Sequence, residues 1–520
     1  MTTGEACCIV QCQIISALFG HSTLTFQTNV SQPAHHSQGE GTMNAPQRRE
    51  ISQAIGSRFV ILDEDGQETE VSSPPAQLPI LEKFPNLKAL VNVELLKGQP
   101  GTEPPSIQAM QQLELVDYEP ASDKGHFRWY PKGALIFNLL RQWAEEIALG
   151  RLDAYPIETP IIYDWDEPDI RSQAESFHEN HYVVRLPDKP EKEFILRFAG
   201  DFGLFRMMRD AQLTYKHLPV RLYEFAPSFR YEASGSLSGL RRLRGFWMPD
   251  IHSFCLDLKQ GLDEYKTLFY RYTDLANGMG VNYAVAFRVV EEFYEAHKAE
   301  LVEMIKYNGA PALIEILSDM KHYWVLKHEV NTVDCNAGIC QTSTVQLDIK
   351  DAALYGITYV VADGEQKGCT IVHSSIGSIE RWVFSILEDA LKKDPPVLPL
   401  WLAPTQIRII PVSEEKHLGY CLGVAEELKK HRIRVDVDDR NESMGWRIRG
   451  AEREWVPYVV VCGDKEQAGA PLSVRIRGAK QEQMSVAELA SLISRQTAQM
   501  PFSYLSGMLV SKRPVFRGRD

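Results

Sequence analysis

Residues 226–255 read APSFRYEASGSLSGLRRLRGFWMPDIHSFC. Two runs in which apolar residues alternate with polar ones flank a middle rich in glycine and serine, at residues 234–239. A strand is hard to continue through such a middle, so the pattern predicts a long β-hairpin. Because successive side chains of a strand point to opposite faces, the pattern also predicts which residues of the hairpin share a face.

One face of this hairpin carries an unusual mixture of residue types. On the first arm it holds Ser228, Arg230 and Glu232. On the return arm it holds Arg242, Arg244, Phe246, Met248, Asp250 and His252. A charged hairpin with one solvated face is the ordinary alternative. However, the polar face includes Phe246 and the opposite face carries Trp247 and Ile251, so neither face is simply solvated. Arginines suited to phosphate, an aromatic ring, a carboxylate and an imidazole on one face predict the floor of an active site.

The composition indicates a globular protein of two or three domains. The chain has 520 residues, 44% of them apolar, which is enough for more than one core. The formal net charge of −13 argues against a protein that coats nucleic acid over its whole surface, although it allows a local basic patch such as RRLR. Nine cysteines without a repeated C-x-x-C spacing indicate neither a disulfide framework nor an all-cysteine zinc site, and they favour a reducing compartment.

Residues 1–47 contain no lysine or arginine. A secretory signal peptide begins with basic residues, and the apolar run at 6–19 is too short to span a membrane. These residues are predicted to be a disordered tail, or upstream sequence that precedes a start at Met43. We therefore expect a cytoplasmic protein without membrane contact.

Linker and turn signals divide the rest of the chain. Residues 48–112 are predicted to form a small N-terminal domain. Residues 113–397 show antiparallel hairpins joined by helices, an α+β pattern, and residues 398–520 alternate strands with helices as a mainly parallel α/β domain does. A helix is expected near residues 311–320. A strand interrupted by Pro160 suits a sheet edge or a subunit contact.

Other stretches place the hairpin in a family. YPIETPI, FRYEASGSLSGLRRLRGFWMPDIHSF and GSIERWVF resemble motifs 1, 2 and 3 of class II aminoacyl-tRNA synthetases and occur in that order. ELVDYEP, YPKG and WMPD are similar to threonyl-tRNA synthetases of the archaeal kind, and DDRNESMGWRIRGAEREWVPYVVVCGDKE is similar to their anticodon-binding domain. The resemblance covers about residues 113–478. It implies an antiparallel catalytic sheet, a homodimer formed through motif 1, and ATP-dependent attachment of threonine to tRNA(Thr).

The resemblance also assigns an ATP site. Arg230 would hold the α-phosphate and Arg381 the γ-phosphate, with help from Arg242, because a guanidinium offers paired donors and stays charged. Phe246 would stack on adenine, Glu232 would meet the adenine edge or the tRNA end, and Mg²⁺ would bridge the phosphates. Formation of the adenylate needs no protein nucleophile, only positioned charges.

A metal and an amino-acid pocket are implied as well. In the family a zinc ion held by one cysteine and two histidines takes the amino and hydroxyl groups of threonine, which rejects valine. The matching positions are His252, His373 and, in place of the cysteine, Asp201. An aspartate would make the site harder and leaves the identity of the metal open. The residues expected to contact threonine are Asp250, Gln341, Gln346 and Lys327.

Four residues match family positions that read the anticodon: Asn441, Arg449, Glu466 and Arg475. The segment before residue 113 is too short for the family's editing domain and lacks an HxxxH signature, so we expect a catalytic form that makes some Ser-tRNA and has a separate trans-editing partner. Two alternatives stay open. One is a paralogue with altered amino-acid choice, which Asp201 motivates; the other is a non-catalytic RNA-binding regulator, which the retained Arg230 and Arg381 argue against.

Overall fold

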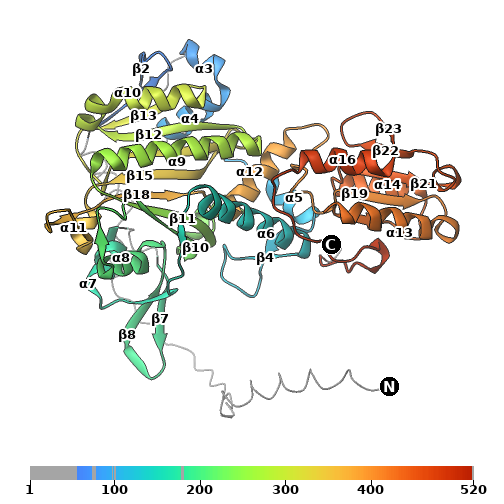
Figure 1. The fold of residues 1–520 in the computed structure, drawn as a ribbon, viewed down its shortest axis with the longest axis horizontal. Coiled ribbons are helices and arrows are strands. Elements are labelled where there is room, and N and C mark those ends of the chain that lie inside the picture. Colours follow the sequence, from blue (N-terminus) through green and yellow to red (C-terminus); the bar gives the residue numbers. More distant parts are fainter. Residues whose placement is uncertain (1–55, 73–77, 97, 99–100, 177–180, 518–520) are drawn as a thin grey trace, which may run out of the picture. The chain divides into compact units, whose positions relative to one another are not determined.

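The structure, a computed structural model, describes residues 56–72, 78–96, 98, 101–176 and 181–517 (Figure 1). The predictions for residues 1–47 lie outside the described residues. No helix in the described part of the chain is long and apolar enough to cross a membrane.

Ten strands form the main sheet, in the order β2-β1-β13-β12-β14-β15-β18-β11-β10-β5. Neighbouring strands are antiparallel except in the pairs β12/β13 and β5/β10. The strands are β1 (Ser57–Leu62), β2 (Glu68–Val71), β5 (Tyr155–Pro156), β10 (Val220–Phe229), β11 (Gly245–Cys255), β12 (Tyr283–Val290), β13 (Ala312–Leu317), β14 (Trp324–Val333), β15 (Ile339–Asp348) and β18 (Thr370–Ser375). The predicted α+β class with an antiparallel catalytic sheet is confirmed.

Helices and three small sheets surround this sheet. The helices are α3 (Pro79–Lys83), α4 (Pro85–Leu95), α5 (Ser106–Gln112), α6 (Pro131–Glu145) with the π-helical turn η1 (Glu146–Arg151), α7 (Pro168–Ser176), α8 (Asp201–Asp210), η2 (Ser234–Ser236), α9 (Leu258–Met279), α10 (Glu291–Asn308), α11 (Asp351–Tyr355) and α12 (Ile379–Leu391). The small sheets are β3 (Val116–Tyr118) with β4 (Phe127–Trp129), β6 (Ile162–Asp164) with β8 (Lys189–Leu196) and β7 (Val183–Leu186), and β17 (Gln366–Gly368) with β16 (Thr358–Val360) and β9 (Leu213–Thr214). Before residue 113 the described residues contribute edge strands and short helices to this unit, and no separate editing domain occurs among them.

Strand alternation gives the main sheet two different faces. On β12, Phe287 and its odd-numbered neighbours pack with α9, α10 and α12 into the largest hydrophobic core. The even-numbered Ala284 and Ala286 pack under α4. Arg288, the next even-numbered residue, lines a cavity instead. One face of the sheet is therefore covered by α4 at one end and open at the other, and the functional site lies on the open part.

The C-terminal residues form a second sheet, in the order β20-β19-β21-β22-β23 (Figure 1). Its strands are β19 (Ile407–Pro411), β20 (Val435–Val437), β21 (Tyr458–Cys462), β22 (Leu472–Ile476) and β23 (Glu482–Met484). Its helices are α13 (Glu414–Lys430), α14 (Met444–Arg453), α15 (Asp464–Gln467), α16 (Val486–Gln496) and η3 (Val510–Lys512). β19 pairs in parallel with β20 and β21, as the alternation of strands and helices predicts, while β22 and β23 add antiparallel strands.

Three expectations need correction. Residues 311–320 contain β13 rather than a helix, because a short buried run such as ALIEIL fits a strand or a helix equally well. The stretch around Pro160 is not one strand: β5 ends at Pro156 and β6 begins at Ile162, with β5 at the predicted sheet edge. Arg244 does not lie on the active-site face of the hairpin and forms an ion pair with Asp123 instead. The prediction fails because residues 230–244 form a loop, in which strand alternation does not hold.

Candidate active site

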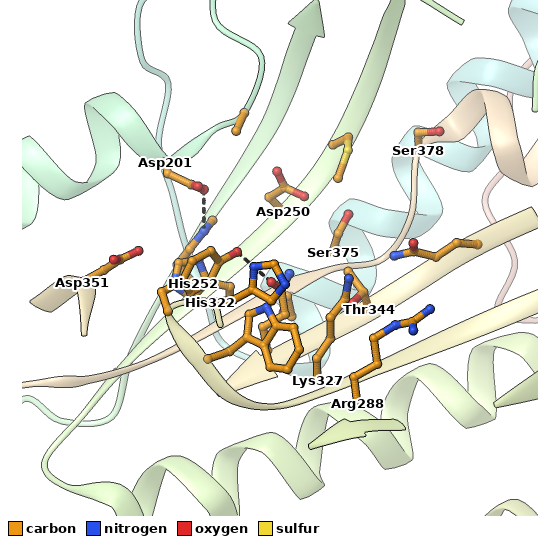
Figure 2. Close-up of a pocket in the computed structure, with 18 of the residues that line it drawn as sticks. Asp201, Asp250, His252, Arg288, His322, Lys327, Thr344, Asp351, Ser375 and Ser378 are labelled. Atoms are coloured by element: carbon orange, nitrogen blue, oxygen red, sulfur yellow. Dashed lines mark hydrogen bonds and ion pairs between the residues drawn. The ribbon is translucent and has the colours of Figure 1, made fainter. Parts of the chain in front are cut away.

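A cavity of about 830 Å³ lies on the open part of the sheet face (Figure 2). Its walls come from β11, β12, β13, β14, β15 and β18, from the loop 230–244, from residues 321–323, and from α8, α11 and α12. Every residue predicted to contact ATP, threonine or the metal lines this cavity. These residues are Asp201, Arg230, Glu232, Arg242, Phe246, Asp250, His252, Lys327, Gln341, Gln346, His373 and Arg381. The fold thus gathers groups that the sequence scatters over separate strands, helices and a loop.

Two arginines form one part of the cavity wall. Arg230 follows the last residue of β10, and its Nε donates to the carbonyl oxygen of Phe198 at 3.0 Å. Its guanidinium lies 5.2 Å from the centre of the Phe246 ring. Arg381 lies in the first turn of α12, where its backbone N–H donates to the cap residue Ser378. Burial and the positive charge of Arg381 lower the pKa of Arg230, so this part of the cavity favours a bound anion.

Arg242 and Glu232 contact each other in this wall. Nε and Nη2 of Arg242 lie 3.1 and 2.8 Å from Glu232 Oε2. The Arg242 side chain is 52% exposed, and an ion pair at such a site contributes little stability. A phosphate oxygen of a ligand can therefore replace Glu232 as the partner of Arg242 at small cost.

Asp201, His252 and His373 meet in another part of the cavity. Their ligand atoms lie within 4.8 Å of one another, and Asp201 Oδ1 lies 3.0 Å from His252 Nε2 (Figure 2). Asp201 is the first residue of α8. His252 on β11 lies directly opposite His373 on β18, with the ring centres 5.0 Å apart. Strand register and one helix start therefore produce the cluster.

This donor set fits a divalent metal ion. Zinc accepts imidazole nitrogen and carboxylate oxygen, and three protein ligands leave positions for a substrate. His373 Nε2 lies 2.7 Å from Asp348 Oδ2, an arrangement by which carboxylates orient metal-binding histidines. Although burial lowers the pKa of His373, Asp348 raises it to about 9. Asp348, Asp351 and His373 form a second donor group that shares this histidine.

Asp250 lies on β11 two residues before His252 and lines the same cavity (Figure 2). Burial raises the pKa of Asp250 to about 6. Within the described part of the chain, its Oδ1 atom has no hydrogen-bond partner. A buried carboxyl oxygen is costly unless a ligand or water pairs with it, so Asp250 is well placed to bind a hydroxyl or amino group.

Gln346 and Lys327 approach this cluster from the neighbouring strands. Gln346 on β15 lies opposite His373, and its Oε1 accepts a hydrogen bond from the Tyr323 hydroxyl at 2.6 Å. Lys327 lies opposite Gln346 on β14 and forms an ion pair with Glu329 at 2.7 Å. The strands therefore place an amide and an ammonium beside the carboxylates and imidazoles.

Comparison with known proteins relates this arrangement to a family. The model of the tRNA synthetase class II core domain (G, H, P, S and T) matches residues 182–390, and that of the anticodon binding domain matches residues 406–496. A threonine–tRNA ligase of Pyrococcus furiosus is 41% identical over an alignment of 475 residues, which covers 87% of this chain and 75% of the relative. The chain belongs to the threonine–tRNA ligase family. A further member of the family, from Thermococcus kodakarensis, is 40% identical over an alignment of 482 residues, which covers 89% of this chain and 76% of the relative.

Solved structures agree with the fold of the threonine–tRNA ligase family. The RNA binding domain of threonyl-tRNA synthetase from Cryptosporidium parvum Iowa II has a TM-score of 0.66 at 23% identity, over 76% of this chain and 98% of that structure. Prolyl-tRNA synthetase from Cryptosporidium parvum, complexed with L-proline and AMP, has a TM-score of 0.61 at 16% identity, over 76% of this chain and 74% of that structure. At these identities the likeness shows the fold alone.

Sequence reasoning missed several cavity residues. They are Arg288, Glu315, His322, Tyr323, Trp324, Thr344 and Asp351. Asp348 was missed as well, and it contacts His373 from outside the cavity wall. Asp348 and Thr344 share the strand face of Gln346, so strand alternation along β15 could have found both. Tyr323 precedes β14 and Asp351 begins α11. Because neither residue lies in a strand, strand alternation could not have predicted them.

The four predicted anticodon residues all lie in the C-terminal unit of the threonine–tRNA ligase fold. Asn441 follows β20 in an exposed loop, and Arg449 is exposed on α14. Glu466 lies on α15, where Oε2 accepts the Gly463 N–H at 2.9 Å. Arg475 is exposed on β22 and lies 3.9 Å from Glu452. Glu466 therefore also has a local capping role.

Proposed function

We propose that the protein is a threonine–tRNA ligase, which activates threonine with ATP to threonyl-adenylate and transfers it to tRNA(Thr). The observation that carries this proposal is one cavity that holds both required chemistries. Arg230, Arg381 and Phe246 supply cations and an aromatic ring for a nucleotide. Asp201, His252 and His373 lie in the same cavity as donors for a metal ion.

In adenylation the threonine carboxylate attacks the α-phosphorus of ATP, the bond to the bridging oxygen breaks, and pyrophosphate leaves. Arg230 holds the α-phosphate and Arg381 the γ-phosphate, while Phe246 stacks on adenine. Arg242 exchanges Glu232 for a phosphate oxygen, which frees Glu232 for the adenine edge or the tRNA end. Mg²⁺, when bound, neutralises charge between the phosphates. The protein thus accelerates the step by position and charge alone.

The amino-acid end of the cavity selects the substrate. Asp201, His252 and His373 would hold zinc, which when bound supplies a Lewis acid for the amino and hydroxyl groups of threonine. Asp250 accepts a hydrogen bond from the threonine hydroxyl. Its pKa is raised because the carboxyl is buried in the cavity wall. The residues that complete the threonine pocket are Gln341, Gln346 and Lys327. A substrate without a hydroxyl leaves these polar groups unpaired, which disfavours valine strongly.

The rest of the molecule serves tRNA. We propose residues 113–397 as the catalytic domain and 398–520 as the anticodon-binding domain, which reads the anticodon through Asn441, Arg449, Glu466 and Arg475. A homodimer forms through the segment around β5, since that edge strand exposes 65% of Tyr155. The enzyme acts in the cytoplasm, and a separate protein removes serine attached by mistake.

The test is ATP–pyrophosphate exchange with each amino acid in excess Mg²⁺, with and without a zinc-selective chelator. We expect exchange with threonine, weaker exchange with serine, and loss of both on chelation. Exchange with a different amino acid would replace the proposal by altered amino-acid choice, which the aspartate at position 201 makes chemically reasonable. Exchange with none of them would support a non-catalytic RNA-binding regulator. The serine result is checked separately by acid-gel detection of Ser-tRNA at high serine concentration.

A further inference from the structure

The guanidinium of Arg381 is aimed by two backbone carbonyl groups. Its Nε donates to the carbonyl oxygen of Arg241 at 3.2 Å. Its Nη1 donates to the carbonyl oxygen of Gln341 at 3.0 Å. Arg241 belongs to the loop 230–244 and Gln341 to β15, so the direction of the Arg381 side chain depends on how these two segments are held.

The loop carbonyl is held through the Arg241 side chain. Nη1 of Arg241 donates to Asp334 Oδ2 at 3.0 Å, and Nη2 donates to Ser238 Oγ at 3.1 Å. The side chains of Arg241 and Asp334 are 13% and 1% exposed, so solvent screens this ion pair weakly. The guanidinium of Arg241 also lies 5.9 Å from the ring of Phe384 on α12, the helix that carries Arg381.

The strand carbonyl is held through the same aspartate. Asp334 Oδ1 accepts the backbone N–H groups of Asn336 at 2.8 Å and Gly338 at 2.7 Å. These bonds shape the turn between β14 and β15, and Gly338 in this turn lies three residues before Gln341. Oδ1 of Asp334 therefore shapes the turn that leads to the Gln341 carbonyl. Oδ2 of Asp334 anchors the side chain of Arg241, the residue that provides the second carbonyl.

We infer that Asp334 and Arg241 are positioning residues for the nucleotide site: together they fix both carbonyls that aim Arg381 at the terminal phosphate of ATP. This inference rests on the γ-phosphate role proposed for Arg381. Neither Asp334 nor Arg241 lines the cavity, so both act through Arg381 and not on the nucleotide itself. A guanidinium that is aimed before ATP arrives loses less freedom on binding, which strengthens its contact with the phosphate.

The variant Asp334→Asn tests the inference. The asparagine carbonyl can still accept the Asn336 and Gly338 N–H groups, but the ionic partner of Arg241 is lost. Binding of Mg²⁺–ATP and Mg²⁺–ADP to the full chain is measured without threonine, since the two nucleotides differ only in the γ-phosphate. We expect the affinity for ATP to fall about tenfold or more, because small misplacements of a binding group are costly, and the affinity for ADP to stay within about twofold. Arg241→Met, which removes the other partner, should give the same pattern.

A double variant shows whether the effect passes through Arg381. In an Arg381→Ala background, Asp334→Asn should change ATP affinity no further, because coupled residues are not additive. Glu264→Gln is the matched control: it removes the partner of Arg221, another largely buried arginine–carboxylate pair, away from the cavity. It should leave the ratio of ATP to ADP affinity unchanged.

Four outcomes would overturn the inference. One is equal weakening of ATP and ADP in Asp334→Asn, which is what a general loss of structure produces. Another is additive loss in the double variant. The third is a ratio of ATP affinity to ADP affinity that Asp334→Asn leaves unchanged although Arg381→Ala lowers it. This result would leave the γ-phosphate role of Arg381 intact. A wild type that binds ATP no better than ADP would overturn both the role of Arg381 and the inference.

Discussion

Glu380 shows how a single buried carboxyl can link two segments that line the cavity. It precedes Arg381 on α12 and is 2% exposed. Its Oε2 accepts the backbone N–H of Trp247, on β11, at 3.1 Å. This bond joins the helix that carries Arg381 to the strand that carries Phe246. Burial raises the pKa of Glu380 from 4.5 to about 8, so the carboxyl keeps its proton at neutral pH.

The stability of the fold should therefore depend on pH through Glu380. The unfolded chain releases this proton near pH 4.5 and the folded protein near pH 8, so the stabilising contribution is complete below pH 4.5 and is lost as the pH rises to about 8. Glu380→Gln keeps a carbonyl acceptor for Trp247 but cannot ionise. We expect its Tm to exceed that of the wild type by about 2–4 °C at pH 8, and by less at pH 5. A Tm difference that is constant over this range would contradict the prediction.

Asp201 and Asp351 distinguish the two donor groups that share His373. If the ion binds to Asp201, His252 and His373, Asp201→Ala should weaken zinc binding by about 10–100-fold or more, since loss even of outer partners has effects of this size. Asp351→Asn should then keep most of the metal. Metal content after dialysis against buffered zinc measures this, and ATP affinity serves as the folding control. The opposite pattern would place the ion with Asp348 and Asp351.

At the scale of elements, the turn just before α12 contains a glycine that no other residue can easily replace. Gly377 has a φ of +103°, and a Cβ there would lie 2.8 Å from the carbonyl carbon of Thr342 on β15. The close approach of the turn to β15 sets where α12 begins, and hence where Arg381 lies.

Gly377→Ala should consequently destabilise the protein by at least about 1–2 kcal/mol, because an L-residue is strained at positive φ, and it should also raise KM for ATP. Gly278→Ala is the control. Gly278 lies in α9, and a Cβ added to it would meet no atom within 4 Å, so alanine should stabilise the helix by about 0.5–1 kcal/mol. Urea unfolding measures both effects, and a Gly377→Ala variant as stable as Gly278→Ala would disprove the argument.

Regular strands are the elements that the sequence predicts well. β11 is unbroken from Gly245 to Cys255, so alternation correctly placed Phe246, Asp250 and His252 in one cavity. Alternation failed at Arg244, which lies in the loop just before that strand and turns toward Asp123. The failure has a physical reason: a period of two holds only while strand dihedral angles persist.

Elements that depend on tertiary contacts were harder to predict. Six apolar-rich residues, 312–317, are a strand because β1 and β12 flank them, and the sequence of the segment alone does not contain that information. Similarly, Tyr323 and Asp351 reach the site from a turn and a five-residue helix. The sequence motifs predicted which residues gather at the cavity, whereas the ion pair between Arg241 and Asp334 required the structure.

At the scale of the whole molecule, the C-terminal segment ties the anticodon-binding unit to the catalytic unit. Residues 508–513 lie along β20: Val437 N–H donates to the Met508 carbonyl, and Ser511 donates to Asp439 at 2.5 Å. Further on, the backbone N–H of Phe516 donates to Glu114 Oε1 at 3.2 Å. A second link joins Lys132 of α6 to Glu454, which follows α14, at 2.9 Å.

A chain that ends at Arg513 should lose the bond between Phe516 and Glu114, while it keeps the Lys132–Glu454 link and the ion pair between Arg513 and Asp436. The remaining Lys132–Glu454 pair and the two separate cores keep each unit folded, so threonine-dependent ATP–pyrophosphate exchange should stay within about twofold of the wild type. Charging of tRNA should suffer more, because one tRNA must contact both units at once and a looser connection lowers the effective concentration of the second contact. We expect KM for tRNA to rise about three- to tenfold in aminoacylation assays.

Phe516→Ala in the full chain removes the ring near Tyr130 but keeps the backbone bond to Glu114, and it should have a smaller effect. If the shortened chain lost pyrophosphate exchange and tRNA charging equally, the segment would stabilise the catalytic unit itself and would not act as a connection between the two units.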